Sequence, residues 1–185
     1  MRNVFFYFIV VTMFIHCKSS VNDENNSTNS QVEKMIQLES KIYSLQSDIK
    51  KNNEKLKLGG ELYKIATNFI NDYPEDDKIE RVYLLAARGA EANGNYDNAI
   101  NYYYLAQRKF PESSYSPEYL KSRAIILDFK LNRKKEAILA HEELIELYPE
   151  HPLAIDSKNY LKKNLIDLPE NISSEELEKI LKTKD

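Results

Sequence analysis

The sequence predicts an all-α protein built from antiparallel helix pairs. Among its 185 residues there are only 4 Gly and 6 Pro, whereas residues with good helix propensity, such as Leu, Ala, Lys and Glu, are common. An aromatic–Pro–Glu triplet recurs at Tyr73, Phe110 and Tyr148, at spacings of 37 and 38 residues. An amphipathic run with helical periodicity precedes each triplet. A repeat of this length is typical of stacked helical pairs.

The bulk composition narrows the class of partner. The formal net charge of -3 creates no overall field that would favour nucleic acid or an acidic membrane surface. A single Cys excludes an intrachain disulfide and a cysteine-based metal cluster. The 13 Tyr suit helix packing in which the ring is buried and the hydroxyl stays hydrated.

Residues 1–16 are predicted to be a signal peptide. A short basic start precedes an apolar run over residues 4–15, which is too short to span a bilayer because a span needs about 20 residues. Cys17 follows directly, and its position resembles the lipidation site of bacterial lipoproteins. His16 stands where that site usually has a small residue. Lys18, the residue after the Cys, resembles an outer-membrane sorting signal. The other interpretation is an ordinary signal peptide, or an uncleaved anchor, in which Cys17 is incidental.

The next two segments are predicted to be a tether and a helix. Residues 17–31 are rich in Ser, Asn and Thr, a composition typical of a flexible, here lipid-anchored, tether. Residues 32–58 carry apolar side chains at alternating spacings of three and four, with Asn52 at one core position. This stripe predicts either a short coiled coil, and through it a homo-oligomer, or a helix that packs against the repeats. Gly59 and Gly60 are expected to end the helix.

Residues 59–168 contain the repeats, and the middle unit is the most complete. Proline disfavours helical geometry in the residue before it and removes a backbone donor, so each helix is expected to end before Pro74, Pro111 or Pro149. The residues expected to pack the repeats together are small residues, aromatics and turn residues, namely Ala87, Gly94, Tyr96, Ala99, Tyr103, Ala106 and Pro111, followed by Ala137 and Pro149 in the next unit.

These residues in this order resemble the tetratricopeptide repeat. The longer spacing is similar to that of two cell-envelope groups, the lipoprotein of the outer-membrane assembly machine and the Tol-Pal-associated coiled-coil periplasmic protein. The resemblance implies a short right-handed solenoid in which alanines lie where paired helices approach closely. Residues 169–185 then form a capping helix, because Ser173 and Glu176 have capping-box spacing and such stacks need a polar end.

No catalytic, metal-binding or cofactor-binding pattern stands out, so we expect a protein that is not an enzyme and has no cofactor. His141 begins a sequence like a zinc-protease helix, but Ile145 occupies the position of the second ligand; we expect His141 to be a packing or surface residue. The basic runs 133–135 and 162–163 are interpreted as solvated helix ends rather than nucleic-acid contacts.

The resemblance implies that the first helix of each pair lines a concave groove. Repeat phase then predicts a set of groove residues that bind a protein or peptide partner: Arg81, Arg88, Glu91, Tyr119 and Lys130. Arg and Tyr are common hot-spot residues. Leu84, Ile126 and Phe129 are predicted to belong to the core instead.

Taken together, these expectations describe a non-enzymatic protein-binding scaffold of the bacterial cell envelope. It would be a lipoprotein of the outer membrane that faces the periplasm. The alternative is a soluble periplasmic coiled-coil repeat protein that acts as an oligomer and coordinates envelope or division machinery.

Overall fold

The computed structural model describes residues 26–165, and all regular structure in that range is helical. The predicted all-α class is therefore confirmed for this part of the chain. The elements are an N-terminal helix (residues 26–44), η1 (Ile49–Lys51), α2 (Asn52–Asp72), α3 (Ile79–Ala92), α4 (Tyr96–Lys109), α5 (Ser116–Phe129), α6 (Lys134–Leu147), α7 (Pro152–Tyr160) and η2 (Leu161–Leu165).

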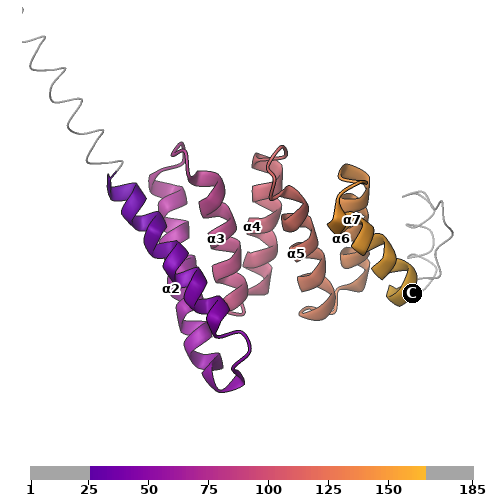
Figure 1. Cartoon of the computed structure of the whole chain (residues 1–185), viewed down its shortest axis with the longest axis horizontal. Coiled ribbons are helices and arrows are strands. Elements are labelled where there is room, and N and C mark those ends of the chain that lie inside the picture. Colours follow the sequence, from indigo (N-terminus) through magenta and orange to yellow (C-terminus); the bar gives the residue numbers. More distant parts are fainter. Residues whose placement is uncertain (1–25, 166–185) are drawn as a thin grey trace, which may run out of the picture.

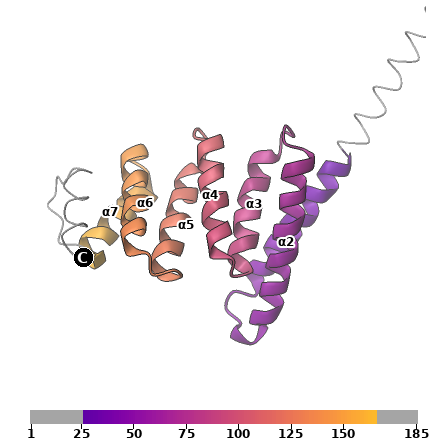
Figure 2. The same cartoon turned by 180° about the vertical axis from the view of Figure 1, so that it is seen from behind.

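The helices from α2 onward lie side by side in the order of the chain (Figures 1 and 2). α2 packs on α3, α3 on α4, α4 on α5, α5 on α6 and α6 on α7. The connecting turns therefore lie at two opposite edges of the row. The turns at 73–78, 110–115 and 148–151 form one edge, which we call the proline edge, and the turns at 45–51, 93–95 and 130–133 form the other. The described chain begins at the proline edge.

Three helices end where proline requires them to end. Tyr73, Phe110 and Tyr148 have left helical geometry, with ψ of 57°, 62° and 54°. Each still donates its backbone N–H to the carbonyl four residues earlier, so no donor is lost before the proline. The next helix then starts after a short turn in the opposite direction.

Two turns of the opposite edge contain a residue with positive φ instead of a proline. Gly94 has φ of 81° and Asn132 has φ of 53°, the left-handed region that glycine and asparagine tolerate best. The turn before α4 is also capped, because the Asn95 side chain accepts from Asn98 N at 3.4 Å. Asn132 thus replaces the glycine that the middle unit carries.

The helix end expected at Gly59 and Gly60 is wrong. The chain turns at residues 45–48, and α2 continues through both glycines. A Cβ on Gly59 would lie 2.5 Å from Asn93 N, and a Cβ on Gly89 of α3 would lie 2.6 Å from Tyr63 N. The glycines therefore allow two helices to approach backbone to backbone, and that use of glycine overrides its low helix propensity.

The expected start of this helix is also wrong. Residues 26–31 are already helical, so the last six residues of the predicted tether (17–31) belong to the helix, and Thr28 is only 1 % exposed. Val32, Met35 and Ile42 belong to one core cluster with Leu62 and Phe69 of α2. Tertiary packing outweighs the polar composition here. The burial also favours the interpretation that the stripe packs against the following helices.

The core runs along the whole row of helices. The small residues at the helix crossings have no exposed surface: Ala87, Ala99, Ala106 and Ala137. Tyr103 is 2 % exposed and packs with Tyr96 in the cluster between α3, α4 and α5. Gly94 and the prolines Pro111 and Pro149 lie at exposed turns.

Three of the predictions concern residues outside the described range: the signal peptide 1–16, the lipidation of Cys17 and the capping helix 169–185. Within residues 26–165, no helix combines the length and the apolar character that a membrane crossing needs.

Candidate binding groove

A cavity of about 270 Å³ opens between the N-terminal helix, α3 and α5. Side chains from these helices and from α2 and α4 contribute to its wall. Most of them are polar or aromatic: Glu39, Tyr43, Gln46, Lys55, Arg88, Glu91, Tyr96, Tyr103, Glu118, Ser122 and Lys130, together with Ile42, Leu62 and Ala92. Because five elements meet here, the cavity exists only when the helices are stacked.

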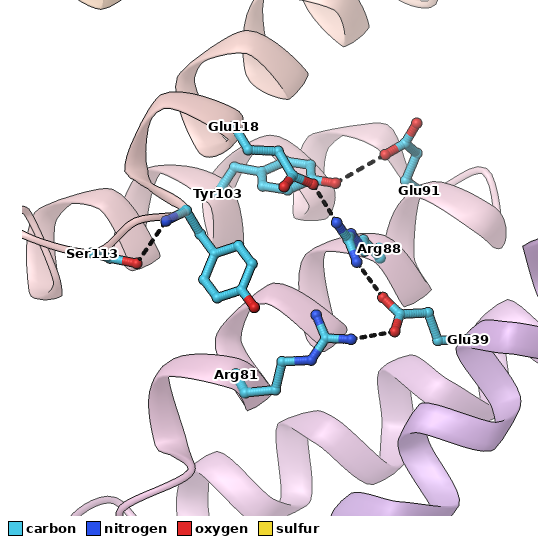
Figure 3. A network of polar contacts seen from close by, with 8 residues as sticks. Glu39, Arg81, Arg88, Glu91, Tyr103, Ser113 and Glu118 are labelled. Carbon is cyan, nitrogen blue, oxygen red and sulfur yellow. Dashed lines mark hydrogen bonds and ion pairs between the residues drawn. The ribbon is translucent and has the colours of Figure 1, made fainter. Parts of the chain in front are cut away.

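A chain of charge pairs crosses the cavity (Figure 3). Arg81 and Arg88 of α3 both donate to the Glu39 carboxylate of the N-terminal helix. Arg88 also donates to Glu118 of α5. Glu39 thus contacts two guanidinium groups and Arg88 contacts two carboxylates. Three helices that are not consecutive in the chain are thereby linked on one face of the row. Hydrogen bonds between ionised groups are stronger than neutral ones.

Arg88 is the centre of this network. Burial by itself would lower the pKa of its guanidinium, but the hydrogen bonds that Arg88 donates to Glu39 and Glu118 raise this pKa above its usual value. The Tyr43 ring lies 5.7 Å from Arg88 Cζ, within cation–π range. Tyr43 itself is 48 % exposed, so its outer face remains open to a partner.

Tyr103 lines the cavity from α4. Its hydroxyl donates to Glu91 at 3.0 Å, and burial, followed by the Glu91 charge, raises the pKa of Tyr103 well above its usual value. A phenol that remains protonated keeps donating to Glu91. The carboxylate of α3 is thereby held against α4.

Three of the five predicted groove residues, Arg88, Glu91 and Lys130, line the cavity. Arg81 joins them through Glu39. The placement of Tyr119 in the groove is wrong, because this side chain has no exposed surface and packs in the core. Its neighbour Glu118 lines the cavity instead.

A register error explains the misplacement of Tyr119. Tyr119 lies 38 residues after Arg81, whereas Pro74 and Pro111 are 37 residues apart. The shift of 37 leads from Arg81 to Glu118. On a helix one position turns a side chain by about 100°, enough to move it from the groove into the core.

Phe129 was also misplaced. It was predicted to be a core residue but is 64 % exposed, whereas Leu84 and Ile126 are buried. Sequence reasoning missed Glu39 and Tyr43 as groove residues, because the helix that carries them was assigned to a separate segment. No local signal marks Glu39, since it becomes a groove residue only through its contact with α3.

A second polar cluster lies away from the groove, between α5, α6 and α7. Ser157 Oγ is 2.9 Å from His141 Nδ1 and accepts from Lys121 Nζ at 3.1 Å. Nearby, the Tyr160 hydroxyl donates to Asp128. Burial, followed by the charge of Lys121, lowers the pKa of His141 to about 4. His141 is therefore neutral and packs inside the protein, and Ser157, with no exposed surface, is inaccessible to a substrate.

The groove contains both paired and unpaired charges. Glu39, Arg88 and Glu118 are ion-paired, and Glu91 accepts from Tyr103. Lys55 and Lys130 form no ion pair with any described side chain, and the Tyr43 ring is exposed. Over residues 26–165, no group of three or more His, Cys, Asp or Glu is arranged to hold a metal ion. No protein-family model matches the sequence, and no curated protein matches it either.

Proposed function

We propose that this chain is a non-enzymatic scaffold of the bacterial cell envelope that binds a protein or peptide in the groove between the N-terminal helix, α3 and α5. The observation that carries the proposal is the cavity of about 270 Å³, lined by paired charges and by the exposed Tyr43. Mixed polar walls with one accessible aromatic suit a polypeptide, whose backbone offers donors and acceptors along its length.

The order of the helices supports a tetratricopeptide-like, right-handed solenoid. The first helix of each pair would be the N-terminal helix, α3 and α5, and these are the helices that supply Glu39, Arg88 and Glu118. In such a solenoid the first helices line the concave face. A rigid concave groove lowers the entropy cost of binding because its side chains are already ordered.

The location is proposed from the N-terminus. The signal-like residues 1–16 and Cys17 support a lipid anchor in the outer membrane, with the helices facing the periplasm. Metabolic labelling with a palmitate analogue tests this part. We expect labelled protein from the natural chain and none from Cys17→Ser; equal labelling of both would rule out an anchor at Cys17.

The alternative, an oligomer formed through residues 32–58, receives less support. Met35 and Ile42 are 0 % and 6 % exposed because they already pack within their own chain, and a coiled coil needs those positions free for a partner.

Site-specific photo-crosslinking tests the groove. A photoreactive phenylalanine analogue is placed at Tyr43 in the groove or at Tyr104 on α4, which are 48 % and 44 % exposed. Tyr104 does not line the cavity, so it is a matched control. We expect a discrete adduct in cells from position 43 and not from position 104. The same adduct from both positions, or none from position 43, would contradict the assignment.

A further inference from the structure

The turns at the two edges of the row of helices carry opposite charge. The turns of the proline edge hold five carboxylates and one lysine: Glu75, Asp76, Asp77, Glu112, Glu150 and Lys78. The turns of the opposite edge hold four cations and one carboxylate: Lys50, Lys51, Lys130, Arg133 and Asp48. This separation is hidden in the net charge of -3. We call the second edge the basic edge.

The basic edge is most concentrated where α5 meets α6. Lys130 and Lys134 are exposed and form no ion pair with any described side chain. Arg133 is held by Asp97 at 3.1 Å and by Glu136. Asp128 of α5 is 8 % exposed and accepts from Tyr160. Asp97 and Glu136 are also exposed, so the three cations Lys130, Arg133 and Lys134 exceed the exposed carboxylates of this corner by one.

An exposed aromatic residue lies at the same corner. Phe129 is 64 % exposed, the highest value among the large hydrophobic residues of the described range. Its ring centroid is 6.0 Å from that of Tyr160, which fixes the ring at the end of α5 next to Lys130. One turn beyond Tyr160, Lys163 of η2 is also exposed.

From this arrangement we infer that the basic edge docks on an anionic phospholipid surface, with Phe129 entering the headgroup region and the lysines around it contacting lipid phosphates. Lysine stems are long enough to reach a plane of phosphates while the ring is partly buried in the interface. Each cation near such a surface raises binding about fivefold.

A membrane fits these residues better than a nucleic acid does. Binding of a single strand relies on several aromatic faces on which successive bases stack, and this corner presents one exposed ring. Lys130 also lines the cavity, whereas Phe129 and Lys134 do not, so these two residues test the inference separately from the groove.

Vesicle co-sedimentation of the full chain tests the inference. The vesicles are phosphatidylcholine alone or phosphatidylcholine with phosphatidylglycerol, and binding is taken as the excess on the anionic vesicles, which removes any contribution of the apolar N-terminus. We expect excess binding at low salt that falls at high salt, because salt screens exposed charges.

Charge-matched variants locate the contact. Lys130→Gln with Lys134→Gln should weaken the excess binding about 25-fold, since each lysine contributes about fivefold. The control pair Lys64→Gln with Arg108→Gln removes two exposed cations away from the edge and should leave binding unchanged. Phe129→Ser should weaken binding at both salt concentrations. All three chains should have the same far-ultraviolet circular dichroism as the natural one.

Three outcomes would overturn the inference. One is the absence of excess binding to anionic vesicles at low salt. Another is an equal loss in the control pair, which would show that only total charge matters. The last is sedimentation without vesicles, which would indicate that the basic edge binds the acidic proline edge of a second copy.

Discussion

The interface between α2 and α3 and the interface between α6 and α7 are built in opposite ways. Between α2 and α3, glycines remove side chains, so a Cβ on Gly89 would lie 2.6 Å from a backbone nitrogen. Between α6 and α7, a buried polar pair, His141 and Ser157, fills the space. A larger side chain should therefore destabilise the α2–α3 interface, and protonation should destabilise the α6–α7 interface.

The same contrast separates the groove from the α6–α7 cluster. The groove holds full charges that remain partly exposed, since the side chains of Arg81 and Arg88 are 27 % and 20 % exposed. The cluster holds a histidine that burial keeps neutral. Charges near water can be retained by pairing, whereas a group sealed from water is more stable without its charge.

The largest expected effect is at the glycine interface. Gly89→Ala should lower the free energy of unfolding by about 2–3 kcal/mol, because the new methyl group pushes against the backbone of Tyr63 and the helices must separate. Gly60→Ala is the matched control, since its Cβ would meet only the Asn93 side chain. That variant should be neutral or more stable by up to about 1 kcal/mol. Equal losses in urea unfolding of both variants would contradict the close-approach role of Gly89.

Acid should act mainly on the α6–α7 interface. The pKa of His141 is about 4 in the folded protein and 6.5 ordinarily, so the unfolded chain takes up the proton first. This stability is present above pH 6.5 and is lost as the pH falls toward 4. The natural chain should lose about 2 kcal/mol more between pH 7 and pH 5 than His141→Leu does. Parallel pH profiles of the two chains would show that His141 is not sealed from water.

The charge pairs of the groove should contribute less to the free energy of unfolding than Gly89 and His141 do. Glu39→Gln leaves Arg81 and Arg88 without a shared carboxylate and should cost about 1–2 kcal/mol at low salt, with a smaller loss at high salt. Glu33→Gln changes an exposed carboxylate of the same helix and should have no effect. If the loss in Glu39→Gln were independent of salt, packing rather than charge would be its cause.

The smallest expected effect is at Glu142. Burial, followed by the charge of Glu146, raises the pKa of this carboxyl to about 7. A raised carboxyl pKa favours the folded state at low pH, and this contribution disappears as the pH rises through 7. Glu142→Gln should therefore gain stability relative to the natural chain above pH 7, by less than about 1 kcal/mol after solvent screening. Thermal unfolding at two pH values measures the difference, and a destabilised variant at high pH would contradict the sign.

The sequence by itself determined the class of the fold and three of its helix ends. Proline acts on its immediate neighbour, so the ends before Pro74, Pro111 and Pro149 follow from local sterics. The buried alanines of α3 and α4 were likewise predictable, because the spacing of a repeat can be measured directly in the sequence. Arg88 and Glu91 were found from their places in the middle unit, whereas Lys130 lies 38 residues after Ala92, the same one-residue register error that misplaced Tyr119.

Only the tertiary structure decided the roles that depend on a distant neighbour. Gly59 has the sequence signature of a helix end, but the backbone of Asn93 makes it a contact point inside α2. Glu39 became a groove residue because α3 places two arginines against it. The net charge did not predict a basic edge, because a sum over the chain does not record the edge at which each turn lies. These features arise from distances across helices, and distance along the chain does not specify them.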